Sequence, residues 1–135
     1  NERIAYYEQQ GIACWSGNDD ESFVGRHQHK SHGVISVTSN IIPELMRQLM
    51  DNNDVLLNER LQGLIKWLFC EPNPIAINTA LMMTEAVSAN FRLPYNALTL
   101  AQRQQGFALL SAFEQDELVG NALTLMADED FNYCE

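Results

Sequence analysis

The chain has 135 residues, of which 46% are hydrophobic and 19% are charged, as in an ordinary globular domain. Eighteen acidic residues against eight basic ones give a formal net charge of -10, and no lysine or arginine follows Arg103. This charge repels phosphate groups, so we expect neither nucleic acid nor an anionic membrane as a partner. No apolar run reaches the roughly 18 residues of a membrane helix, and no targeting segment is visible.

The first residues predict the end of a helix. Ile4 and Ala5 lie one helical turn before Tyr7, and Gly11 is placed to act as a C-cap. The segment 1–11 therefore reads as a helix that stops at the glycine.

Two short apolar runs follow, at residues 12–16 and 34–38, and neither alternates in polarity. Continuous apolar and β-branched character is typical of parallel strands that are buried on both faces. The 17 residues from Gly17 to Gly33 are enough for a parallel crossover that carries a short helix at about residues 19–30.

After the second run the hydrophobic spacing becomes helical, and no further strand is expected. Pro43 suits a first helical turn, Asn53 or Asp54 can cap the next helix, and Asn73 can cap a third. Thr99 and Gln102 have the spacing of a capping box. The helices are predicted at about residues 43–51, 54–68, 74–87 and 99–113.

Two parallel strands followed by helices predict an α/β fold. Two strands alone leave a hydrogen-bonding edge unpaired, so we expect more strands upstream. The pattern fits the C-terminal part of a (β/α)8 barrel, a fold of about 250 residues. The expected division is the end of the barrel, with strands seven and eight, in residues 1–42, helices of the same domain in 43–115, and an acidic extension in 116–135.

Four blocks of sequence carry a family resemblance: WSGNDDE from Trp15, GVISVTSN from Gly33, KWLFCEPNPIAINTAL from Lys66 and FRLPY from Phe91. In order and spacing they resemble the C-terminal half of the 4-hydroxy-tetrahydrodipicolinate synthase family, also called the dihydrodipicolinate synthase family. The first block and the extension ELVGNALTLMADEDF resemble the plant-type branch of the family.

The resemblance implies a lyase of the lysine (diaminopimelate) pathway that condenses pyruvate with aspartate semialdehyde. In the family, a lysine forms a Schiff base with pyruvate and a tyrosine relays protons. Both residues lie upstream of this chain, so the chain alone is expected to be inactive. The resemblance also implies no cofactor, a homo-oligomer, and either the cytoplasm or, in a plant or alga, the plastid stroma.

Substrate-binding positions carry over from the family at the ends of the two predicted strands. Gly17 matches a glycine that lines the pocket entered by the aldehyde, and Ile35 matches a position whose backbone contacts pyruvate. Asn18 and Asp19 follow Gly17 and are expected to contact the second substrate, although Asn18 replaces the aspartate common in bacterial relatives. An alternative is that Asn18, Asp19 and Asp20 only cap the crossover helix.

Other chemical side chains have structural interpretations. Lys30 precedes the second strand and Lys66 lies in a predicted outer helix, so both are expected to be bystanders. His27, His29 and His32 lack an accompanying carboxylate or thiolate at a usual ligand spacing, so we expect a solvated loop and no metal site.

The cysteines are Cys14, Cys70 and Cys134, an odd number at wide spacing that does not suit a disulfide framework. Cys14 and Cys70 lie in apolar runs and are predicted to be buried small side chains.

Two alternative functions remain open at the level of sequence. Another pyruvate-dependent aldolase, acting on sialic acid or a keto-sugar acid, would use the same lysine and differ at residues outside this chain. The EPNP and FRLP motifs favour the synthase. A non-catalytic helical module that binds a partner is the remaining alternative.

Overall fold

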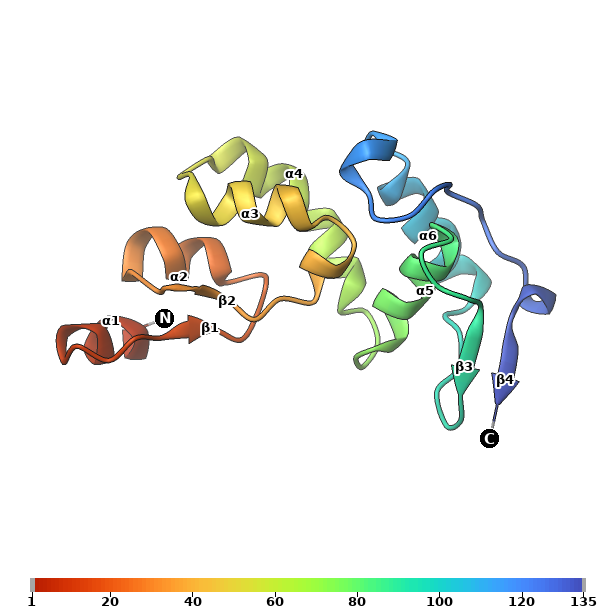
Figure 1. Cartoon of the computed structure of the whole chain (residues 1–135), viewed down its shortest axis with the longest axis horizontal. Coiled ribbons are helices and arrows are strands. Elements are labelled where there is room, and N and C mark those ends of the chain that lie inside the picture. The colour runs from red at the N-terminus through yellow and green to blue at the C-terminus, as the bar shows by residue number, and fades with distance from the viewer. Residues whose placement is uncertain (1, 135) are drawn as a thin grey trace.

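The computed structural model describes residues 2–134. Its helices are α1 (Glu2–Gln9), α2 (Ser22–His29), α3 (Pro43–Asp51), α4 (Val55–Leu68), α5 (Ile75–Met83) and α6 (Leu100–Leu110), with 3-10 turns η1 (Thr38–Asn40), η2 (Gln115–Glu117) and η3 (Asp128–Asp130). Its strands are β1 (Trp15–Ser16), β2 (Gly33–Val34), β3 (Asn90–Arg92) and β4 (Asn132–Cys134). The molecule is elongated, with β1 and β2 at one end and β3 and β4 at the other (Figure 1). Within residues 2–134 no helix is long and apolar enough to cross a membrane.

The first helix ends as predicted, because Gly11 takes a left-handed backbone (φ 74). The two predicted parallel strands and their crossover helix α2 are also confirmed, with Trp15 opposite Gly33 and Ser16 opposite Val34. The predicted strands at residues 12–16 and 34–38 are longer than the observed ones, which have two residues each. The chain leaves the strand after Val34 and turns into η1, which the sequence did not predict.

The prediction that both strands are buried on two faces is wrong for this chain. Trp15 is 54% exposed and Ile35 is 72% exposed. Helix α2 packs along the pair and the His32 ring lies 5.3 Å from that of Trp15, yet both side chains remain largely exposed. The two strands therefore carry apolar side chains that residues 2–134 leave exposed.

Helices α3 and α4 form where the sequence predicts them. Pro43 occupies the first turn of α3, where its missing N–H costs no hydrogen bond. The Asp54 side chain caps α4 by accepting a hydrogen bond of 3.0 Å from the N–H of Leu57. Their apolar faces meet α5, α6 and η1 in a core whose most deeply buried members include Ile41, Ile42, Leu49, Leu61, Leu64, Ile65, Leu68, Met83 and Leu110.

Helix α5 is shorter than the predicted 74–87. It starts at Ile75, with no side-chain cap from Asn73, and it ends at Met83. The cause of the early stop is Glu85, whose left-handed backbone (φ 57) lets the N–H of Ala86 reach back to the Leu81 carbonyl at 2.9 Å.

Helix α6 has the predicted capping box of Thr99 and Gln102. It ends at Leu110, three residues before the predicted end. It packs on α4 through Trp67, which is 2% exposed and donates an indole hydrogen bond of 2.8 Å to the Gln102 carbonyl. Gly106 leaves the space for this ring, because a Cβ there would lie 2.0 Å from Trp67 Cζ2.

The expectation that only helices follow β2 is wrong, because the acidic extension returns and pairs with the chain. β3 and β4 are parallel, with Phe91 opposite Tyr133. Each strand has three residues, too few to show a period of two in the sequence. Arg103, 1% exposed, donates to the carboxylate of Asp128 and lies over the ring of Phe131, which fixes the extension to α6.

A second anchor holds the start of the extension. Arg60 on α4 forms a two-pronged ion pair with Glu117, at 2.8 and 2.6 Å. The hydrogen bond from Arg60 lowers the pKa of Glu117 below its ordinary value, and the same bond raises the pKa of Arg60. Val119 then donates to the Ile41 carbonyl at 2.8 Å, so the extension reaches the junction that follows β2.

We predict that Gly106→Ala lowers the free energy of unfolding by about 1–3 kcal/mol, because the new methyl group overlaps the ring of Trp67. Gly63→Ala is the matched control. Its Cβ would meet only the flexible end of Leu109, at 3.2 Å, and alanine favours a helix over glycine by about 1 kcal/mol. Urea titrations followed by tryptophan fluorescence measure both. Equal stability of the two variants would contradict the packing described here.

We predict that Glu117→Gln removes an acid-sensitive contribution to stability. The folded-state pKa of Glu117 is depressed, so the contribution is present above the unfolded pKa of about 4.3 and is lost as pH falls through the folded value. Because the Arg60 side chain is 41% exposed, solvent screening keeps the effect under about 1 kcal/mol. Melting temperatures should differ between wild type and variant at pH 7 and converge once the pH falls below the folded-state pKa of Glu117. Glu129→Gln, which removes the same charge from a side chain with no ion pair within residues 2–134, controls for net charge.

Candidate functional site

The loop after β1 and the turn after β2 meet at one edge of the parallel pair. Gly17 directly follows β1 and Ile35 directly follows β2. The Ile35 N–H donates a hydrogen bond of 2.8 Å to the Ser16 carbonyl, which places the two predicted site residues side by side. This is the carboxyl edge of the strands, where barrel enzymes carry their active sites.

Open space lies beside Gly17. A Cβ built there meets no atom within 4 Å, and the glycine backbone is outside the left-handed region. The residue at this position is therefore not fixed as glycine by strain or by a clash within residues 2–134. Space next to an exposed backbone at a strand end is what a ligand needs for close approach.

A short hydrogen-bonded turn shapes the loop. The Ser16 hydroxyl donates to the Asn18 carbonyl at 2.9 Å and accepts from the Asn18 N–H at 3.3 Å. Such turns fix the backbone and leave the side chain at the tip free. The amide of Asn18 is exposed and available to a ligand.

Asp19 does not cap the crossover helix with its side chain. The residue before α2 is Glu21, which makes no side-chain cap hydrogen bond. The carboxylate of Asp19 instead turns toward the end of β2, where its Oδ2 accepts from the N–H of Val37 at 3.0 Å, the N–H of Thr38 at 2.8 Å and the Thr38 hydroxyl at 2.8 Å. The capping interpretation is therefore wrong for Asp19.

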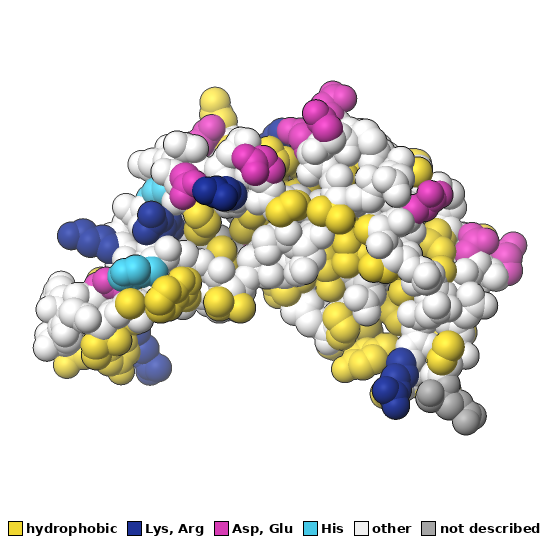
Figure 2. Space-filling model, in the orientation of Figure 1, with side chains coloured by type: hydrophobic (Ala, Val, Ile, Leu, Met, Phe, Trp, Pro, Cys, Tyr) yellow, Lys and Arg dark blue, Asp and Glu magenta, His cyan; other side chains and the backbone are white. Residues whose placement is uncertain are grey.

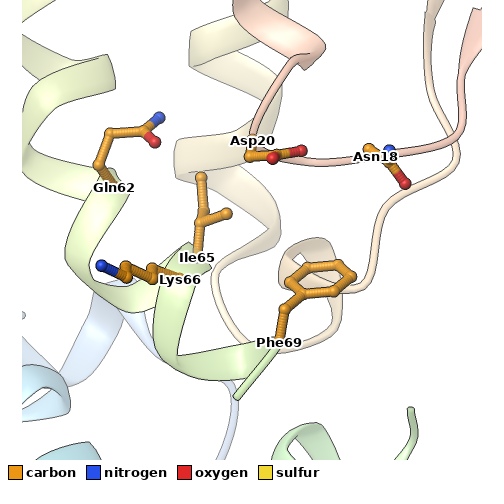
Figure 3. A pocket seen from close by; sticks show the side chains of 6 residues that line it. All are labelled: Asn18, Asp20, Gln62, Ile65, Lys66 and Phe69. Carbon is orange, nitrogen blue, oxygen red and sulfur yellow. The ribbon is translucent and has the colours of Figure 1, made fainter. Parts of the chain in front are cut away.

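A cavity of about 500 Å³ lies between this loop and helix α4. Figure 3 shows Gln62 and Lys66 of α4 on one side and Asn18 and Asp20 of the loop on the other. Ile65 and Phe69 form an apolar floor. The cavity thus has a cation and an anion on opposite walls, with amide groups on both.

The two lysines differ in location. Lys30 ends α2 and lines a separate hollow beside α1, away from the carboxyl edge of the strands. Lys66 lies on α4 as predicted, but it shares a cavity with Asn18 and is therefore closer to the site than the sequence suggested.

The histidines do not gather into one site. His27 Nε2 lies 2.8 Å from the Leu49 carbonyl oxygen, whereas His32 Nδ1 lies 3.0 Å from a carboxylate oxygen of Glu8. Among residues 2–134 no group of three or more histidine, cysteine or acidic side chains could hold a metal ion.

The cysteine prediction is wrong for Cys70, which is exposed, while Cys14 is half-buried. Cys70 follows the end of α4, so its side chain falls outside the apolar stripe that the sequence suggested. Partial burial of the thiol and the neighbouring Glu71 raise the pKa of Cys70, which favours the unreactive protonated form.

Comparison with known proteins assigns this arrangement to a family. A family model described as the dihydrodipicolinate synthetase family matches residues 1–113. The chain belongs to this family. The relative from Coix lacryma-jobi, named a chloroplastic 4-hydroxy-tetrahydrodipicolinate synthase, is 45% identical over 131 residues, which are 96% of this chain and 35% of the relative. The Zea mays protein of the same name is 44% identical over 131 residues, or 96% of this chain and 34% of the relative. The chain therefore spans about a third of the length of these relatives.

Solved structures of dihydrodipicolinate synthases confirm the predicted fold class, part of a (β/α)8 barrel. One superposes with a TM-score of 0.72 at 25% identity and covers 82% of this chain and 41% of its own. The enzyme from Acinetobacter baumannii, solved as a complex with pyruvate, superposes with a TM-score of 0.67 at 30% identity over 74% of this chain and 36% of its own.

Sequence reasoning predicted that Gly17, Asn18 and Ile35 lie at the carboxyl edge of the strands, where the structure has them, but it missed the cavity wall opposite Asn18. Gln62 and Lys66 lie on the exposed face of an amphipathic helix, which resembles any solvated helix surface. The one signal in the sequence was Phe69, a large apolar side chain placed directly after the end of the helix.

We predict that pyruvate followed by borohydride leaves the mass of this dihydrodipicolinate synthetase family chain unchanged. A Schiff-base amine is activated by an apolar pocket or a neighbouring cation, whereas Lys66 is exposed beside Asp20 and two amides. Intact-mass spectrometry makes the measurement, with the Lys66→Arg variant treated in parallel. An adduct on Lys66 that is absent from Lys66→Arg would make this lysine a nucleophile and contradict its assignment as a bystander.

Proposed function

We propose that this chain forms part of a lyase that condenses pyruvate with aspartate semialdehyde to 4-hydroxy-tetrahydrodipicolinate in lysine biosynthesis. The observation that carries the proposal is the side-by-side placement of Gly17 and Ile35 at the carboxyl edge of β1 and β2. Family membership and the names of the plant relatives support the choice of reaction.

The chemistry divides between this chain and the remainder of a polypeptide as long as the relatives. A lysine amine outside the chain attacks the ketone carbon of pyruvate, and loss of water gives an iminium ion. Removal of a methyl proton gives an enamine, whose carbon attacks the aldehyde of the second substrate. The new alkoxide takes up a proton, and the amino group of the second substrate then attacks the iminium carbon, which closes the ring and releases the lysine amine. A tyrosine hydroxyl relays the protons. Residues 1–42 supply the substrate pocket, 43–115 its helical support and 116–135 the acidic extension.

The proposed substrate contacts follow the geometry of the edge. The backbone at Ile35 contacts pyruvate, as the resemblance to the family implies for this position. The open side of Gly17 admits the aldehyde. Asn18, at the tip of the loop, contacts the second substrate from the cavity mouth. Asp19 also supports this pocket, but its carboxylate is buried and bonds to Val37 and Thr38, so it does not contact a substrate directly.

The cavity favours an amino-acid aldehyde over a sugar acid. Aspartate semialdehyde carries an ammonium group and a carboxylate, and Asp20 and Lys66 offer the two complementary charges across about 500 Å³. A keto-sugar acid has no ammonium group for Asp20. The cavity therefore supports the synthase over the sugar-acid aldolases of the same superfamily.

We further propose a homo-oligomer, as the resemblance implies, and a plastid location if the source is a plant or alga. The plant relatives are named chloroplastic, which supports the second point.

We predict that Gly17→Val lowers kcat/KM by about a hundredfold, because the isopropyl group fills the space through which the aldehyde approaches. Stability should change by under about 1 kcal/mol, since the added Cβ meets no atom within 4 Å and the backbone needs no left-handed conformation. The test protein is a chimera in which this segment replaces the matching 131 residues of the Zea mays relative.

Steady-state kinetics for both substrates and melting temperatures are compared for the chimera with and without the substitution. Gly63→Ala, at a glycine of α4 that neighbours Leu109 and does not line the cavity, is the control. Near-normal kinetics in Gly17→Val would show that this loop does not line the pocket. An inactive unsubstituted chimera would overturn the proposed function itself.

A further inference from the structure

The carboxylate of Asp19 is buried and hydrogen-bonded across the site. The residue is 1% exposed, and one oxygen accepts hydrogen bonds from Val37 and from both the N–H and the hydroxyl of Thr38, at 2.8–3.0 Å. A carboxylate loses much solvation energy when it leaves water, and it persists in a protein interior only with such donors. Hydrogen bonds to an ionised acceptor are stronger than neutral ones.

The donors come from the start of the 3-10 turn η1, 18 and 19 residues along the chain. The first N–H groups of a helical turn have no partner within the turn and need an outside acceptor. Val37, at the capping position of η1, makes no side-chain cap hydrogen bond. Asp19 supplies the missing acceptor from the loop that follows the other strand.

This connection fixes the spacing of the two pocket positions. Gly17 lies two residues before Asp19, and Ile35 lies two residues before Val37. The Asp19 carboxylate and the β-ladder bond from Ile35 to Ser16 thus close a small ring of chain that contains both positions. Removing the carboxylate leaves only the ladder bond to hold the two segments in register.

Direct contact with a substrate does not fit the burial. The unused oxygen Oδ1 is also inaccessible and has no hydrogen-bond partner among the described residues. A small molecule at the open side of Gly17 meets backbone and the Asn18 side chain, whereas the Asp19 carboxylate points into the protein toward η1.

We propose that Asp19 is a positioning residue, whose carboxylate holds the loop after β1 against the turn after β2 and so sets the pocket formed by Gly17 and Ile35. The effect of Asp19 on catalysis rests on the proposed function, whereas its contact with Val37 and Thr38 rests on geometry alone. We call the contact between the Asp19 carboxylate and Val37 and Thr38 the Asp19 clamp.

The clamp is tested with graded variants of the same Zea mays chimera. Asp19→Asn keeps one acceptor oxygen and the size of the side chain but loses the charge, whereas Asp19→Ala loses both. Thr38→Val removes one donor at nearly constant shape, and Thr38→Ser restores the hydroxyl. Glu59→Gln, an exposed carboxylate on α4 outside the cavity, controls for charge.

Hydrogen exchange measured by mass spectrometry reads the clamp itself and does not require activity. Exchange in peptides that contain Val37 and Thr38 should accelerate about tenfold or more in Asp19→Ala and less in Asp19→Asn. Glu59→Gln should leave it unchanged. Unchanged exchange in Asp19→Ala would overturn the clamp, even if the unsubstituted chimera proves inactive.

Kinetics read the positioning role at a temperature well below each melting midpoint. We expect kcat/KM to fall about a hundredfold in Asp19→Ala and about tenfold in Asp19→Asn, with pyruvate KM raised, because misplacement of about 1 Å has such effects. Thr38→Val should weaken activity, Thr38→Ser should recover it, and Asp19→Asn with Thr38→Val should be non-additive. An active chimera whose kinetics survive Asp19→Ala, with faster exchange, would reduce the clamp to a structural contact and overturn the positioning role while sparing the proposed function.

Discussion

The buried junction between β2 and α3, residues 38–42, is the constraint on which the other elements depend. Thr38, Ile41 and Ile42 have no exposed surface. The turn η1 within the junction packs against α3, α4 and α5, and from the acidic extension Val119 donates to the Ile41 carbonyl. Asp19 binds the same junction from the side of the strands. Because these segments are joined to the junction by close packing and backbone hydrogen bonds, elements far apart in the sequence take their places around it.

The buried junction explains how the helices of residues 43–115 contribute to a candidate site at the ends of β1 and β2. Residues 43–115 contribute one wall to the cavity, through Gln62, Lys66 and Phe69 of α4 and its end, while the other wall comes from the loop after β1. The two walls are held together through η1, which contacts α4 on one side and Asp19 on the other. A packing change in the helices therefore reaches the pocket by moving η1, whereas a change on the outer face of α6 meets solvent. Under the proposed function, Asn18 contacts a substrate, whereas Asp19 and η1 hold the contacting residues in place.

The sequence predicted what depends on local chemistry and failed where distant segments decide. Pro43, the Asp54 cap and the Thr99 and Gln102 capping box all act within one helical turn, and all appear as expected. The β3 and β4 pairing joins residues about 40 apart, and nothing in either three-residue strand indicates its partner. Asp19 shows the same limit within the site. A residue that reads as a local cap finds better donors on another segment, and only the fold brings them within 3.0 Å.

The distribution of charge bears on how an acidic protein could bind anionic substrates under the proposed function. Pyruvate and the carboxylate of aspartate semialdehyde meet a chain with a net charge of -10, but exposed charges more than about 8 Å away are largely screened at physiological ionic strength. Figure 2 shows many acidic side chains along the upper and right margins of the molecule, where part of the excess is dispersed. The groups that decide binding are therefore those that line the cavity, with Lys66 on its α4 wall and Asp20 on its loop wall. Lys66 on one wall and the acidic loop with Asp20 on the other favour one orientation of a zwitterionic substrate. For a substrate inside the cavity, these nearby charges outweigh the repulsion that the net charge alone would predict.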